Sequence, residues 1–363
     1  MLVALAVCAL LVVAHEGLRA QAGSGRITDD EFWRVTSELS ESGGRFAQQL
    51  MSNEDSLEFV VPALMRRAPH AAAYLGVGAE QNFTYLAALQ PSIAFIVDIR
   101  RENMLELLMY KALFERAPDR AAFVSQLFSR PRPDGVGAST DVAALFDAFG
   151  GAAPDAALFD QTSRAIVTTL TETHHFALEP ADRAAILGLL DTFRRMGPGA
   201  LKGYGDRTNL TYAEMMAVSD LDGQPRGFLA TESNYRAVRA LEQRNLIIGV
   251  TGDFAGDRAL PGIAAFLKKR HTNVGVFYVS NVERYLFEQG DHGRQFYRNV
   301  AALPLEPSSA FIRSVTRDIS ERLGIALPAP STKWWTFLSP IRECLDGIAS
   351  GRIQTYKDLF AAR

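Results

Sequence analysis

Apolar and polar residues fall into clear blocks between Ala73 and Arg101. A short apolar run ends in Gly76-Val77-Gly78, a helix-like segment follows, and a second apolar run ends at Asp98. This order predicts strand, turn, helix and strand. The glycines permit a sharp turn and close approach of a ligand, and an acid at the end of the second strand can accept hydrogen bonds from a ribose. Because Asp98 follows Gly78 by about twenty residues, the stretch predicts a nucleoside-binding crevice in an α/β fold.

The turn lacks the third glycine of the dinucleotide pattern and carries Glu80 instead. A pyrophosphate beside this carboxylate would be repelled, so the sequence disfavours NAD and FAD and favours a cofactor without phosphate. The residues predicted to bind the cofactor are Gly76, Gly78, Glu80, Asn82 and Asp98.

These features resemble those of the class I S-adenosylmethionine-dependent methyltransferases. The resemblance implies that Gly76 and Gly78 are loop glycines near the amino-acid part of the cofactor and that Asp98 is the ribose acid. Two positions before its first glycine that family usually has an acid, and here the residue is Tyr74.

Four longer strings resemble an uncharacterised bacterial family whose members are described as methyltransferase-like in fold. They are YLGVGAEQNFTY from Tyr74, FIVDIRREN from Phe95, NLIIGVTGDFAG from Asn245 and FYVSNVERYLF from Phe277. The resemblance implies an α/β, Rossmann-like (class I methyltransferase-like) fold. Its mostly parallel sheet would carry helices on both faces and a large helical insertion, and the implied cofactor is S-adenosylmethionine.

The remaining pattern divides the chain into segments. Residues 1–22 are signal-like, residues 23–70 predict a helical cap with a break at Ser42 to Gly44, and residues 71–117 form the first half of the sheet domain. Residues 118–244 predict short helices separated by Pro and Gly clusters, which is typical of an insertion that acts as a lid or adds packing. Residues 245–363 supply the second half of the domain and a C-terminal packing segment that contains Trp334-Trp335. In the cap, Phe46 and Asn53 either reach the ligand or belong to a packing layer.

Polar residues follow two further apolar runs, 245–251 and 274–279. Asp253 and Glu283 are the predicted catalytic residues, since carboxylates at strand ends can serve as bases. The alternative is that Asp253 caps the helix predicted from Ala259 and that Ser280 or Asn281 caps the helix containing Glu283. The residues predicted to bind substrate are Arg100, Tyr278, Ser280, Asn281 and Tyr285. Alternatively, Arg100 is solvated or bridged to Glu102.

Composition narrows the possible partners. The chain of 363 residues is 48% hydrophobic, with a formal net charge of -3 and two cysteines, Cys8 and Cys344. No basic excess indicates nucleic acid, and neither cysteine has a metal-ligand spacing. His174-His175 has no second ligand cluster, so no metal site is predicted. A small-molecule ligand is expected, and oligomeric state is left open.

The apolar run from Leu2 to Ala14, followed by Ala20-Gln21-Ala22, resembles a secretory signal peptide and is too short to span a bilayer. Export to the periplasm conflicts with methyl transfer, because S-adenosylmethionine is held in the cytosol. Two hypotheses therefore stand: a cytoplasmic S-adenosylmethionine-dependent methyltransferase, or an exported, non-catalytic binding or structural module that keeps the fold. A hydrolase that uses Asp253 or Glu283 with water is a third possibility.

Overall fold

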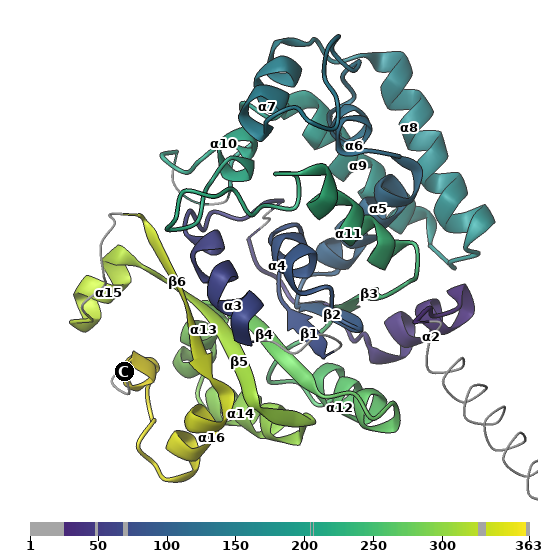
Figure 1. Cartoon of the computed structure of the whole chain (residues 1–363). Coiled ribbons are helices and arrows are strands. Elements are labelled where there is room, and N and C mark those ends of the chain that lie inside the picture. The colour runs from purple at the N-terminus through teal and green to yellow at the C-terminus, as the bar shows by residue number, and fades with distance from the viewer. Residues whose placement is uncertain are drawn as a thin grey trace, which may run out of the picture.

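The computed structural model describes residues 25–47, 50–67, 72–203, 205, 207–325 and 332–360. The signal-like segment 1–22, with Cys8, lies outside the described residues. The described chain forms a mixed α/β structure around one six-stranded sheet of order β3-β2-β1-β4-β5-β6 (Figure 1). The strands are β1 (Ala73–Gly76), β2 (Ile93–Asp98), β3 (Ile247–Thr251), β4 (Val274–Ser280), β5 (Leu305–Thr316) and β6 (Trp334–Pro340). The predicted α/β class is confirmed.

The sheet is mostly parallel. Strands β1 to β5 pair in parallel, and only β6 runs antiparallel, against β5. Trp334 and Trp335 open this edge strand and pair with Thr316 and Val315, so the predicted C-terminal packing segment contributes a strand to the sheet. Aromatic and β-branched residues suit a pleated, half-buried surface, and the stretch from Trp334 to Phe337 is buried.

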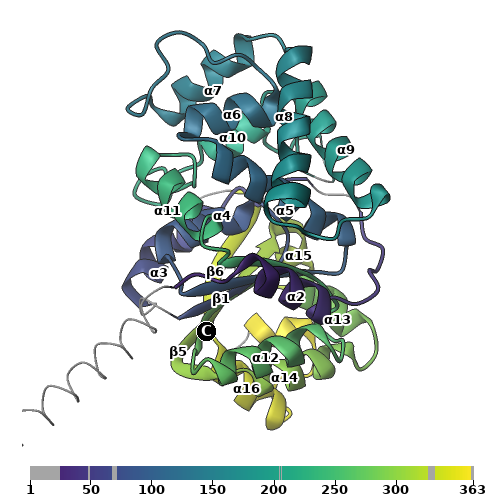
Figure 2. The same ribbon diagram turned by 90° about the vertical axis from the view of Figure 1, so that its right-hand side faces the viewer.

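Helices cover both faces of the sheet (Figure 2). All residues of β1, β2 and β3 are buried, which explains their unbroken apolar runs. One face carries α3 (Val61–Arg67), α4 (Gln81–Leu89), α5 (Arg101–Arg116) and α11 (Glu232–Glu242); the other carries α12 (Ala259–Lys269), α14 (His292–Ala302) and α16 (Ile341–Ala349). Shorter elements after β4 and β5 are α13 (Val282–Glu288) and α15 (Arg317–Leu323), and η3 (Tyr356–Phe360) follows α16.

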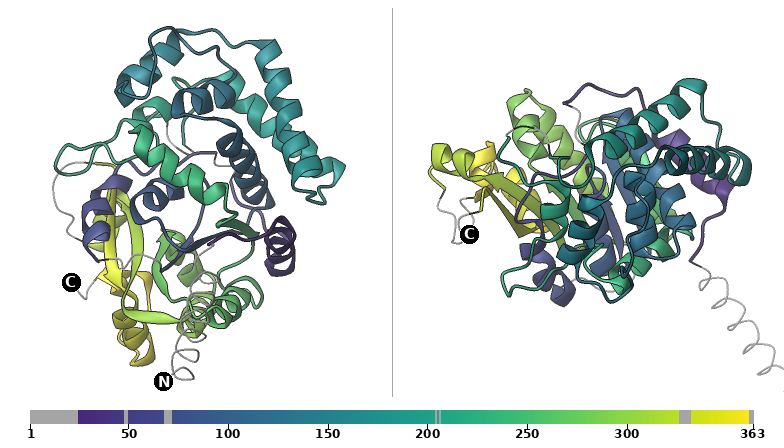
Figure 3. Two further views of the ribbon diagram at one scale, coloured as in Figure 1. Left: turned by 45° about the vertical axis from the view of Figure 1, so that its right-hand side comes forward. Right: turned by 90° about the horizontal axis from the view of Figure 1, so that it is seen from above.

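The segment between α5 and α11 is helical and gathers at one end of the molecule, away from the C-terminal strands (Figures 1 and 3). It contains α6 (Arg120–Phe128), α7 (Val142–Gly151), α8 (Ala156–Thr168), η2 (Thr169–Thr173), α9 (Pro180–Met196) and α10 (Tyr212–Met216). Its aromatic side chains share a core with the helices on the sheet: Phe228 lies 5.3 Å from Phe83 of α4, ring centroid to centroid. The segment therefore packs directly on the sheet domain.

Among the described residues, no single helix has both the length and the apolar character to cross a membrane; α7 together with α8 and η2 meets that test only as a pair bent by 119°.

The N-terminal segment departs from its prediction as an almost continuous helical cap. Helix α2 (Asp29–Leu39) begins at its cap, Thr28, but the described residues from Ser40 to Ser56 form no helix before η1 (Leu57–Val60). Polar side chains in Ser52 to Ser56 bond to buried partners on the sheet, which competes with helix formation. This stretch, the 52–56 loop, therefore runs across the ends of the strands.

Candidate functional site

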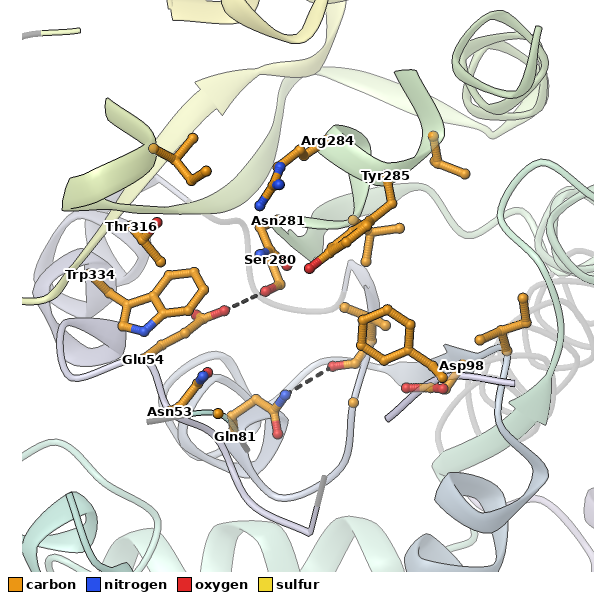
Figure 4. A pocket seen from close by; sticks show the side chains of 18 of the residues that line it. Asn53, Glu54, Gln81, Asp98, Ser280, Asn281, Arg284, Tyr285, Thr316 and Trp334 are labelled. Carbon is orange, nitrogen blue, oxygen red and sulfur yellow. Dashed lines mark hydrogen bonds between the residues drawn. The ribbon is translucent and has the colours of Figure 1, made fainter. Parts of the chain in front are cut away.

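A cavity of about 1120 Å³ opens where the parallel strands end (Figure 4). Open α/β sheets bind ligands at this edge. Lining residues follow every strand from β1 to β5 and start β6: Val77 and Gly78, Asp98, Gly252 and Asp253, Ser280 and Asn281, Thr316, and Trp334.

The turn after β1 brings bare backbone to the cavity at Gly78. The φ of Gly78 is +78°, and a Cβ added there would lie 2.1 Å from the side-chain Nε2 of Gln81. The Asn103 side chain fixes the turn by donating to the Gly78 carbonyl at 2.9 Å. Only glycine suits this position, and Gly78 and Gln81 both line the cavity.

Three residues predicted to bind the cofactor do not line the cavity. Gly76 is required because a Cβ there would lie 2.0 Å from the Asn82 side-chain oxygen. Asn82 is fully buried and is bonded to Tyr74, Val77 and Ala79. Glu80 points inward and accepts from the Ser52 amide at 3.0 Å. These polar groups hold the turn itself, and the cavity is lined instead by Val77, Gly78 and Gln81 of the same turn.

Asp98 lines the cavity, but both oxygens of its carboxylate already accept hydrogen bonds from Arg100. The Arg100 backbone N–H and Nε donate to Asp98 Oδ1 at 2.9 and 3.0 Å, and a terminal guanidinium nitrogen donates to Oδ2 at 2.8 Å. Burial opposes the charge on Arg100, yet its bonds to Asp98 raise its pKa above the ordinary value. Of roughly four acceptor positions on a carboxylate, these bonds use three and leave one for a ligand.

Asp253 lines the cavity above β3. Its Oδ1 accepts from the Ala255 N–H at 2.8 Å, and its own N–H donates to Glu41 at 2.9 Å. Helix α12 starts only at Ala259, with Arg258 as its N-cap residue. Asp253 therefore stabilises a local turn, and the alternative that it caps this helix is wrong.

The turn after β4 contributes Ser280, Asn281 and Tyr285 to the cavity. Ser280 has a φ of +52°, a conformation uncommon for a residue other than glycine, and its hydroxyl donates to Glu54. Asn281 occupies the N-cap position of α13 without a side-chain capping bond. The Tyr285 ring contacts Phe46 edge to face at 5.4 Å.

Tyr278 and Glu283 were predicted at this site, but both side chains are buried in the protein interior. Tyr278 is fully buried and packs on Tyr85 at 5.2 Å. Glu283 is 1% exposed and pairs with Arg313 of β5 at 2.5 Å; Tyr297 also donates to it. Neither lines the cavity, because Tyr278 packs against Tyr85 and Glu283 pairs with the buried Arg313. Glu283, predicted as a catalytic base, therefore lies outside the cavity in a buried ion pair.

The 52–56 loop supplies the main residue that sequence reasoning missed. Glu54 lines the cavity although it is only 3% exposed, and both Phe46 and Asn53 line it as well. Burial raises the pKa of Glu54 despite the serine hydroxyls bonded to it. The available signal was the all-polar run from Ser52 to Ser56, which cannot supply the apolar face of an amphipathic helix.

In the part of the chain that the structure describes, no group of three or more His, Cys, Asp or Glu side chains is arranged to hold a metal ion.

Comparison with known families gives one match. The model of a family described as a domain of unknown function, DUF7790, matches residues 50–135 and 141–338. No curated protein matches the chain. The matched residues include strands β1 to β5, most of β6 and the whole 52–56 loop.

Proposed function

Because the chain belongs to the DUF7790 family, whose description names no activity, we propose its function from the cavity: a Rossmann-like, methyltransferase-like protein that binds S-adenosylmethionine or a related nucleoside. One observation carries the proposal. The backbone of Gly78, in the turn after β1, and the side chain of Asp98, at the end of the neighbouring parallel strand β2, line the same cavity.

The donor set fits a nucleoside without phosphate. Asp98 keeps one acceptor position for a ribose hydroxyl, and Asp253 offers a second carboxylate above the adjacent strand β3. Ile99 and Phe46 line the same side as exposed apolar surfaces, 37% and 49% accessible, on which a purine ring could stack. The cavity wall also carries Arg45, Arg284, Arg317 and Lys333, so the preference for a ligand without phosphate rests on the carboxyl groups of Asp98 and Asp253.

S-Adenosylmethionine supplies an electrophilic methyl group on a positively charged sulfur. In the proposed arrangement, Asp98 orients the ribose and Gly78 admits the amino-acid part. The volume of about 1120 Å³ exceeds the usual upper range of about 1,000 Å³ for one small-molecule site, which leaves room above β4 and β5 for a small acceptor.

The test is isothermal titration calorimetry of the full chain with S-adenosylmethionine and S-adenosylhomocysteine. Asp98→Asn keeps the shape of the side chain but removes its charge, and we expect Kd to rise by roughly 10- to 100-fold, since hydrogen bonds to charged groups contribute about 1.5–3 kcal/mol.

Asp182→Asn is the matched control. Asp182 accepts two bonds from Arg101 at 2.9 and 2.7 Å, much as Asp98 does from Arg100, but it lies outside the cavity. Its substitution should leave Kd unchanged. Absence of binding by either ligand, or equal effects of the two substitutions, would overturn the proposal and favour a non-catalytic module that keeps the fold.

A further inference from the structure

Glu54 occupies an unusual position at the β4–β5 side of the cavity, away from Asp98 (Figure 4). Its carboxyl group accepts from Ser280 Oγ at the end of β4 and from Ser314 Oγ of β5, the latter at 2.5 Å. In the described residues, no Lys, Arg or His lies within ion-pair distance of it. A carboxyl group is thus buried at a ligand cavity with hydroxyl partners and no counter-charge.

The surroundings fix this carboxyl group in place. Ser314 Oγ also lies 3.0 Å from Thr336 Oγ1 of β6, and Thr336 Oγ1 lies 3.0 Å from Ser56 Oγ in the same loop as Glu54. Ser280, which donates to Glu54, has a left-handed backbone conformation. Backbone strain of this kind clusters at functional sites, and here the strained residue, Ser280, donates its hydroxyl to Glu54, which lines the cavity.

We propose that Glu54 is a catalytic residue of this site: it takes the proton from a hydroxyl or amine of a small acceptor bound above β4 and β5. This inference rests on the proposed function. In the step, the acceptor's oxygen or nitrogen forms a bond to the methyl carbon, the methyl–sulfur bond breaks with its electron pair left on sulfur, and the acceptor's proton moves to Glu54.

Proton exchange at Glu54 is set by its environment. Burial raises the pKa of its carboxyl group, hydrogen bonds from the hydroxyls of Ser280, Ser314 and Tyr278 lower it in part, and the nearby charge of Asp55 raises it. Other ionisable groups around Glu54 are Tyr74 on β1, Tyr85 on α4, Tyr278 on β4, Tyr356 on η3 and Glu80 before α4, and the cavity wall also carries Arg284, Arg317 and Lys333. Burial raises the pKa of each of these phenols, so they stay neutral.

A cationic ligand beside Glu54 has a measurable consequence. S-Adenosylmethionine and S-adenosylhomocysteine differ by a methyl group and one positive charge, so a comparison of the two ligands, made in the wild type and in Glu54→Gln, reports on the group that faces this charge. An opposite charge nearby stabilises a carboxylate. The preference for S-adenosylmethionine, written as the ratio of the two Kd values, should therefore increase as pH rises and Glu54 loses its proton.

The experiment is titration calorimetry of the full chain with both ligands from about pH 5 to pH 8, the range in which a carboxyl group with a raised pKa titrates. We expect the ratio to increase by at least about tenfold in the wild type, which corresponds to a shift of one pKa unit. Glu54→Gln should make the ratio independent of pH while binding of S-adenosylhomocysteine persists.

Two further variants make the result specific. Ser314→Ala removes a bond to the charged form from a residue outside the cavity, so it should move the midpoint of the ratio to higher pH. Glu58→Gln removes another buried glutamate, whose pKa burial raises to about 8, but which does not line the cavity. It should leave the profile unchanged.

The outcomes separate the two proposals. If neither ligand binds, the nucleoside function fails, and the role of Glu54 fails with it. If both bind but the ratio does not change with pH, or changes equally in Glu54→Gln, the nucleoside function stands and Glu54 is not the proton acceptor. If the ratio changes with pH equally in the wild type and in Glu54→Gln, the group that titrates is Glu80, beneath the turn.

Discussion

Two buried glutamates lie near the end of β4, and the protein holds them in opposite ways. Glu283 faces Arg313, 2.5 Å away, in the layer beneath the sheet, whereas Glu54 faces the cavity and is bonded to serine hydroxyls. They are 1% and 3% exposed, so burial alone does not distinguish them. The difference lies in the partner: Glu283 pairs with a buried guanidinium, whereas Glu54 is bonded to neutral hydroxyls that leave its carboxyl group able to exchange a proton.

The largest effect is expected from breaking the arginine pair. Glu283→Gln leaves Arg313 as a buried cation without a counter-charge, because its pKa is raised well above the ordinary value by Glu283 in spite of burial. We expect a loss of about 3–5 kcal/mol in the free energy of unfolding, measured by urea denaturation. Glu38→Gln is the control: Glu38 pairs with Arg34 at 2.7 Å, but both side chains are more than half exposed, so the loss should stay below about 1 kcal/mol. Equal losses would mean that Glu283 and Arg313 are not coupled.

A pH-dependent effect is expected at Glu54. Its pKa is raised in the folded state, chiefly by burial, so the folded chain holds this proton more tightly than the unfolded chain. The protonated Glu54 therefore adds to the free energy of unfolding. This contribution is fully present below the pKa of Glu54 in the unfolded chain and is lost as pH rises through its pKa in the folded chain, by no more than about 1.4 kcal/mol per pH unit.

The measurement is the difference in unfolding free energy between wild type and Glu54→Gln across pH. The wild type should lose stability relative to the variant as pH rises from about 4.3, the ordinary glutamate value. A difference that grew in the opposite direction would mean that Glu54 is stabilised as a charge and would remove the contrast with Glu283.

The smallest effect is expected from the hydroxyls that support Glu54. Thr336→Val keeps the side-chain shape but removes the hydroxyl that connects Ser314 to Ser56, and we expect a loss of about 0.5–1.5 kcal/mol in unfolding free energy. Thr192→Val, where the hydroxyl bonds to Gly188 within its own helix, should cost less. If both variants were neutral, the hydroxyls would not hold the 52–56 loop to the sheet.

The part of the site that could be predicted is the part encoded locally. Gly78 and Asp98 lie in one strand, turn, helix and strand unit, so their spacing in sequence fixes their spacing in space. The same pattern did not reveal which way polar side chains point within the turn. Glu80 and Asn82 bond to backbone groups of the turn and of the 52–56 loop, and only the packed structure shows that they face inward.

Glu54 could not be predicted because its contacts come from distant strands. Ser314 and Ser280 follow it by 260 and 226 residues, and no period or spacing in the sequence joins them. The strands themselves were predicted well where they are continuous apolar runs, as in β2 and β3. The edge strand β6 was missed, because a half-exposed antiparallel strand has a weaker pattern than a buried parallel one.

The bond between Ser56 and Thr336 joins residues 280 positions apart in sequence. Contacts of such high sequence separation require most of the chain to be in place before they form. The acid-bearing wall of the cavity should therefore be completed late in folding, after the parallel strands have assembled. Fraying of β6 at the sheet edge would release that wall first, so an opening motion of the pocket is expected to start from the C-terminal strand.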